Sequence, residues 1–92
     1  MVESIIQKER SCYFCGRTDH LEKHHIFAGM ANRRISDQYG LTVWLCHDHH
    51  TGTDGAQYDR EKSLLLKQEA QKAFQAIYGK KLWMTLIRKN YL

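Results

Sequence analysis

The residues best suited to chemistry in this sequence are histidines and cysteines, and most of them lie in short clusters. Four of the six histidines form two adjacent pairs, at residues 24–25 and 49–50. Three cysteines accompany them: Cys12 and Cys15 precede the first pair, and Cys46 lies just before the second. Thiolates and imidazoles are preferred ligands of zinc in proteins. The clusters therefore indicate metal chemistry.

Two of these clusters have the spacing of metal-binding knuckles. Cys12-Tyr-Phe-Cys15 is a C-x2-C pair, and Cys46-His-Asp-His49 is a C-x2-H pair of the same span. Three thiolates and one imidazole make a closed tetrahedral set for structural Zn²⁺. His47 and His50 are alternative fourth ligands, but His49 keeps the two-residue spacing. A chain of 92 residues buries only a modest core, so a zinc ion that links two segments of the chain would add to its stability.

The composition is that of one small globular domain with a mildly basic surface. Apolar residues make up 42% and charged residues 26% of the chain, and the net charge is +4. This charge fits a nucleic-acid partner, although a solvated surface reaches the same balance. We expect a cytoplasmic protein without a membrane partner, because neither a signal-peptide pattern nor a long apolar stretch is present. In a reducing compartment the cysteines are expected to bind metal rather than form disulfides.

Two short strands are predicted to position the first histidine pair and the second knuckle. Residues 21–27, LEKHHIF, and residues 41–45, LTVWL, have the apolar, β-branched and aromatic content typical of strands. Residues 28–40 between them predict a polar loop bounded by glycines. Residues 11–20 are expected to form a turn that carries the two cysteines of the first knuckle. Residues 1–10 are expected to form either a short helix or a loose, irregular segment that leads into it.

Helices are predicted after the second strand. Residues 46–50 predict a short helix, and residues 51–57, TGTDGAQ, predict a break. Asp59 is the expected N-cap of a helix that runs to about Tyr78 and stops at Gly79. The side chains expected on or near its buried stripe are Leu65, Leu66, Glu69, Ala73, Ala76 and Ile77, with Leu64 and Phe74 widening it.

The order of these features resembles that of the HNH, or ββα-metal, nuclease family. The shared features are a C-x2-C knuckle, a strand with His-His-Ile, a strand ending in Leu-Cys, and a C-x2-H knuckle followed at once by His50. This arrangement is similar to the zinc-knuckle variety found in small HNH proteins of phage and prophage genomes. The resemblance covers residues 12–54.

The resemblance implies separate roles for the paired histidines. His24 would bind a catalytic divalent ion, His25 would be the general base, and His50 would be a second ligand of that ion. Alternation along a strand explains the pairing, because neighbouring side chains point to opposite faces. One imidazole can then face the ion while the other takes a proton from a water that attacks a phosphodiester.

The sequence departs from the family pattern at two places. The family has a central asparagine just before the second strand, where this chain reads Tyr39-Gly40-Leu41. Asn32, earlier in the predicted loop, is the expected substitute that orients the base. Many members also carry a further asparagine or histidine after the position of His50. Here Asp54 or Gln57 is the expected final ligand, with water in the remaining positions.

Basic residues near the predicted site suit contact with a phosphate backbone. Arg33 and Arg34 lie between the two predicted strands, and the planar guanidinium group binds phosphate with two parallel hydrogen bonds. Arg34 would also stabilise charge in the transition state, and Lys23 would extend the basic track. The alternative is a solvated loop without a binding role. His20 and His47 are expected to be exposed or to contact a ligand only indirectly.

We therefore predict a single α+β domain over residues 1–92. Its zinc-braced ββα core is expected at about residues 11–58, and a helical extension at 59–92 ends in a second short helix within residues 80–92. The predicted function is metal-dependent hydrolysis of DNA phosphodiesters, with structural Zn²⁺ and a catalytic Mg²⁺, Mn²⁺, Ni²⁺ or Zn²⁺. The main alternative is a non-catalytic zinc-finger module that binds nucleic acid or protein. A third possibility is a zinc-stabilised interaction protein with no nucleic-acid role.

Overall fold

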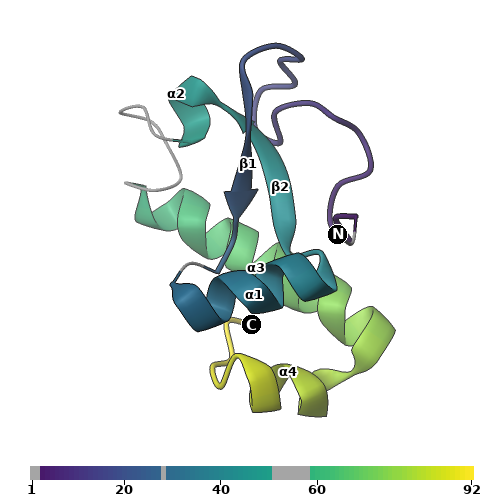
Figure 1. Cartoon of the computed structure of the whole chain (residues 1–92). Coiled ribbons are helices and arrows are strands. Elements are labelled where there is room, and N and C mark those ends of the chain that lie inside the picture. The colour runs from purple at the N-terminus through teal and green to yellow at the C-terminus, as the bar shows by residue number, and fades with distance from the viewer. Residues whose placement is uncertain (1–2, 28, 51–58) are drawn as a thin grey trace.

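The chain folds as a β-hairpin packed against helices, which confirms the expected α+β class (Figure 1). The structure is a computed structural model, and it describes residues 3–27, 29–50 and 59–92. In chain order the elements are β1 (Leu21–His25), α1 (Met30–Tyr39), β2 (Thr42–Cys46), α2 (His47–His50), α3 (Arg60–Tyr78) and α4 (Lys80–Leu86). None of the helices in these ranges is long and apolar enough to cross a membrane.

The hairpin presents the two neighbouring histidines to opposite sides. β1 and β2 pair antiparallel, with His24 opposite Val43 and His25 opposite Thr42. Paired residues share a face, and successive residues alternate between faces. His24 therefore lies on the face that carries Val43, which belongs to the same buried core as the inner side of α3. We call this the α3 face. His25 lies on the opposite face, which we call the α1 face because a side chain of α1 reaches it.

The prediction of a polar loop at residues 28–40 is wrong, because most of this segment forms α1. Gly40 does not bound a loop. It is the helix C-cap, left-handed at φ 72°, and its N–H donates to the carbonyl of Ser36. The buried hydroxyl of Ser36 hydrogen-bonds both the N–H and the carbonyl of Phe27, at 3.3 and 3.1 Å. These two bonds fix α1 beside the end of β1.

The predicted boundaries of α3 are confirmed. The carboxylate of Asp59 accepts from the backbone N–H groups of Glu61 and Lys62, at 2.9 and 3.2 Å. At the other end the N–H of Gly79 donates to the carbonyl of Gln75. The second short helix predicted within residues 80–92 is confirmed as α4, which ends at Leu86.

The predicted buried stripe of α3 is largely wrong. Leu65 and Ile77 are 42% and 57% exposed. The side chains that are buried are Leu66, Ala70, Gln71 and Phe74. Residues 64–66 are three consecutive leucines, so apolar content alone does not show which of them faces the core. The ring of Phe74 packs against that of Trp83, 5.4 Å between centroids, and this contact sets which side of α3 is buried.

The N-terminal segment is an irregular lead-in along the outer edge of β2. The N–H of Ile5 donates to Gly40, and the side chain of Gln7 accepts from the N–H of Trp44. A Cβ atom at Gly40 would lie 2.2 Å from the carbonyl oxygen of Glu3, so only glycine permits this close approach. Further along, the N–H of Tyr13 donates to Trp44, which brings the first cysteine knuckle to the end of the hairpin.

Candidate functional site

The structure brings together the four residues predicted to bind structural zinc. The ligand atoms of Cys12, Cys15, Cys46 and His49 all lie within 4.8 Å of one another. His49 Nδ1 is 3.2 Å from Cys46 Sγ and 3.6 Å from Cys12 Sγ, and the sulfurs of Cys15 and Cys46 are 3.7 Å apart. Ligand atoms of a tetrahedral zinc ion are separated by about 3.5–3.8 Å. The cluster therefore fits structural Zn²⁺.

Local backbone geometry prepares the first knuckle for a metal. Cys12 is buried, and the N–H of Gly16 donates to its carbonyl, which closes the turn. Burial raises the pKa of the Cys12 thiol, but this effect is outweighed by hydrogen bonds from the backbone N–H groups of Cys46, Cys15 and Phe14. The net effect lowers the pKa to about 6. Zinc binds the thiolate, and these donors favour it.

A second group of ionisable side chains lies on the α3 face. The rings of His24 and His50 meet edge to face, with centroids 5.1 Å apart. Burial, together with the positive charges of the nearby His50, His25 and Lys67 side chains, lowers the pKa of His24 to about 4. His24 is therefore neutral at physiological pH, and a neutral imidazole has the lone pair that a metal ion requires.

Glu22, which was not identified from the sequence, orients His50. One carboxylate oxygen lies 2.7 Å from Nδ1 of His50, and the other lies 3.2 Å from Nδ1 of exposed His47. A carboxylate only accepts hydrogen bonds, so Nδ1 of His50 carries a proton, and in the neutral form of the ring Nε2 has the lone pair. Metal-binding histidines commonly have such a carboxylate partner. Hydrogen bonds from His50 and His47 lower the pKa of Glu22.

The side chains of His24 and His50 therefore form a second histidine pair that could supply two ligands to a metal ion. Their rings are adjacent, one is kept neutral by burial, and the free nitrogen of the other is defined by Glu22. Asp54 and Gln57, the predicted final ligands, lie outside the residues that the structure describes.

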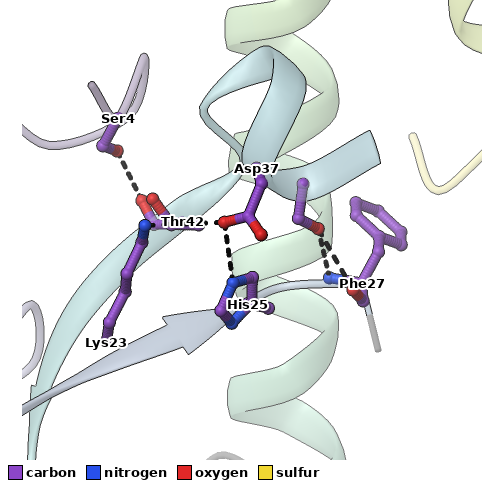
Figure 2. Close-up of polar contacts among 7 residues, drawn as sticks. Ser4, Lys23, His25, Phe27, Asp37 and Thr42 are labelled. Carbon is purple, nitrogen blue, oxygen red and sulfur yellow. Dashed lines mark hydrogen bonds and ion pairs between the residues drawn. The ribbon is translucent and has the colours of Figure 1, made fainter. Parts of the chain in front are cut away.

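On the α1 face, His25 has a different partner. Its Nε2 lies 2.9 Å from an Oδ1 atom of Asp37, which projects from α1 towards β1 (Figure 2). Lys23 approaches the same oxygen at 3.5 Å. The hydrogen bond from His25 and the positive charge of Lys23 lower the pKa of Asp37. Asn32, predicted to orient the base, is exposed on the first turn of α1.

The basic residues predicted to contact phosphate differ in their exposure. Arg33 and Arg34 are exposed on α1. Lys23 borders a groove of about 540 Å³ between the hairpin and the N-terminal segment, and Lys8 and Trp44 also line it. His20 is exposed, as expected.

No protein-family model matches the chain, and no curated protein or solved structure matches it either. The interpretation of the site therefore rests on its geometry. A hairpin, a following helix and a Cys3His cluster are together consistent with a zinc-braced ββα motif.

Proposed function

We propose that this chain is a metal-dependent endonuclease that hydrolyses DNA phosphodiester bonds and is braced by structural zinc. The observation that carries the proposal is that the two neighbouring histidines of β1 have different partners on opposite faces of the strand. His24 lies beside His50 on one face, and His25 bonds Asp37 on the other. A zinc module without catalysis needs the four ligands of the Cys3His cluster and has no need for these further histidines.

His24 and His50 would hold the catalytic ion, with Asp54 as the candidate third ligand. A bound Mg²⁺, Mn²⁺, Ni²⁺ or Zn²⁺ ion supplies positive charge that stabilises the phosphate and the leaving oxygen. Glu22 keeps Nε2 of His50 available, and burial keeps His24 neutral. This division of roles gives the chain one closed metal site and one open metal site.

His25 would act as the general base and take a proton from the attacking water. Within the described part of the chain the sheet has only two strands, so the outer edge of β1 has no partner strand. A phosphodiester bound along this edge would be approached by groups from both faces. The base and the ion can therefore act on one phosphate from opposite sides of the strand.

Contacts to the DNA backbone would come from the basic surface around this edge. Arg33 and Arg34 are exposed on α1, which packs beside β1, and the chain has a net charge of +4. Arg34 would also stabilise charge in the transition state, and Lys23 would extend the contact. Binding through such residues depends on phosphates and has little sequence readout.

The test compares wild type, His25→Ala and His20→Asn on supercoiled plasmid with magnesium, manganese, nickel or excess chelator. His20 is an exposed histidine with φ 51°, a conformation that asparagine tolerates, so its replacement is the matched control. We expect metal-dependent nicking by wild type and the control. His25→Ala should lose at least ~100-fold in rate while it remains folded and keeps its zinc.

Two results would contradict this proposal. Equal activity of His25→Ala and wild type would show that another residue or a contaminant cleaves the plasmid. No cleavage by any variant, with a retained shift of DNA in a gel, would instead support a non-catalytic zinc module that binds nucleic acid.

A further inference from the structure

We propose that Asp37 is the positioning residue for His25. Its carboxylate holds the imidazole as the tautomer with the proton on Nε2, which leaves Nδ1 as the atom that accepts a proton from water. This inference rests on the proposed endonuclease function, because it assigns the atom through which the proposed base acts.

The tautomer follows from the chemistry of the contact. Nε2 of His25 lies 2.9 Å from Oδ1 of Asp37, a normal hydrogen-bond distance. An ionised carboxylate has lone pairs but no proton to donate, so the imidazole must be the donor. When His25 is neutral, its single ring proton is therefore on Nε2, and Nδ1 carries the lone pair. The His25 side chain is only 16% exposed, so solvent competes weakly for Nε2.

The fold holds Asp37 at this place through the residue before it. The hydroxyl of Ser36 bonds both backbone groups of Phe27, two residues after His25. This contact anchors α1 at the end of β1, and Asp37 then projects over the α1 face beside His25 (Figure 2). Lys23 lies on the same face, and its ammonium group is 3.5 Å from the same oxygen. Lys23 therefore offsets the negative charge of Asp37 while His25 is neutral.

A carboxylate differs here from the asparagine that the sequence predicted for this role. An amide carries both donor and acceptor atoms, and it can turn to satisfy either form of an imidazole. A carboxylate satisfies only the form with a proton on the facing nitrogen. Asp37→Asn is therefore a nearly isosteric change, after which the hydrogen bond no longer selects one tautomer of His25.

The experiment combines a spectroscopic measurement with kinetics on the zinc-loaded full chain. Proteins labelled with ¹⁵N-histidine are compared by long-range ¹H–¹⁵N NMR at about pH 8, above the reference pKa of a free imidazole. The variants are Asp37→Ala, Asp37→Asn and Asp37→Glu, and His25→Gln assigns the signal. Asp19→Asn is the matched control, because Asp19 is an exposed aspartate that also lies beside a histidine.

In wild type and the control we expect the Nε2–H form of His25. In Asp37→Ala and Asp37→Asn we expect a mixture of tautomers and a ~10–100-fold lower kcat for plasmid nicking with little change in KM. Asp37→Glu should restore part of the rate.

An unchanged tautomer in Asp37→Ala would overturn the proposal. So would a wild-type kcat for Asp37→Ala in an assay where His25→Ala is inactive. A fully active His25→Ala would instead refute His25 as the base, which separates failure of the proposed function from failure of the role of Asp37.

Discussion

The Cys3His cluster and the histidines of the α3 face use similar side chains in opposite ways. The cluster brings four ligand atoms within 4.8 Å, and two of its cysteines are buried. Among the described residues, the α3 face brings together only two imidazoles, those of His24 and His50, with ring centroids 5.1 Å apart. A structural ion has its shell filled by protein, whereas a catalytic ion keeps positions for water and substrate. We therefore expect the first region to contribute stability, and we propose that the second contributes reactivity.

The two regions also differ in what they join. The cluster links the N-terminal knuckle to Cys46 at the end of β2 and to His49 of α2. The pair on the α3 face links β1 to α2, which are already close because the N–H of His47 donates to the carbonyl of His20. Removal of the cluster should therefore unfold the chain. Removal of the pair should leave the fold intact.

The largest effect is expected from Cys46→Ser or from removal of zinc. Binding of structural zinc contributes on the order of 10 kcal/mol to folding, which is comparable to the total stability of a small domain. We expect loss of the cooperative thermal transition in circular dichroism, with loss of zinc measured by elemental analysis. His20→Asn should keep both. A chelated wild type that still melts within ~5 °C of the zinc form would refute the structural role of the cluster.

His24→Ala should separate the two regions. It removes one proposed ligand of the catalytic ion and none of the Cys3His ligands. We expect full zinc content, a cooperative melt, and at least a ~100-fold loss of metal-dependent nicking. Measurements of zinc, melting temperature and nicking on the same preparation check this. A variant that unfolds like Cys46→Ser would mean that His24 is structural.

Glu22→Gln should have an intermediate effect. The carboxylate fixes the proton on Nδ1 of His50, and loss of such a partner typically costs ~10–100-fold in metal affinity or activity. Titration with Mn²⁺, followed by nicking activity, measures the change. Glu9→Gln, at an exposed glutamate, is the matched control. An unchanged apparent affinity for Mn²⁺ would show that Glu22 does not prepare His50 for a metal.

The smallest effect is expected from Arg33→Ala combined with Arg34→Ala. Loss of two phosphate contacts should weaken DNA binding a few-fold and lower the slope of log K against log salt by about 2. Fluorescence anisotropy at several salt concentrations measures this slope. Lys72→Ala with Lys80→Ala makes the same change in charge on α3 and α4. An equal loss of slope in both double variants would point to general electrostatic attraction rather than a specific surface on α1.

Spacing in the sequence predicted the zinc ligands because knuckles are local and chemically specific. Strand alternation likewise predicted opposite faces for His24 and His25. The roles of Asp37 and Glu22 could not be predicted from the sequence, because their contacts depend on tertiary packing. Asp37 of α1 contacts His25 of β1, and Glu22 of β1 contacts His50 of α2. The prediction of a loop at residues 28–40 missed α1, because a glycine such as Gly40 can mark either the end of a helix or the boundary of a loop.

The most direct test of the account is a count of metal sites on one chain. Zinc-loaded wild type, His24→Ala and His50→Ala are analysed for tightly bound zinc and then titrated with Mn²⁺ in a calorimeter. We predict that all three retain one zinc ion per chain, and that only wild type binds Mn²⁺ at a second, weaker site. A wild type that binds zinc alone, or a second site that survives in both variants, would contradict the division between a structural and a catalytic metal site.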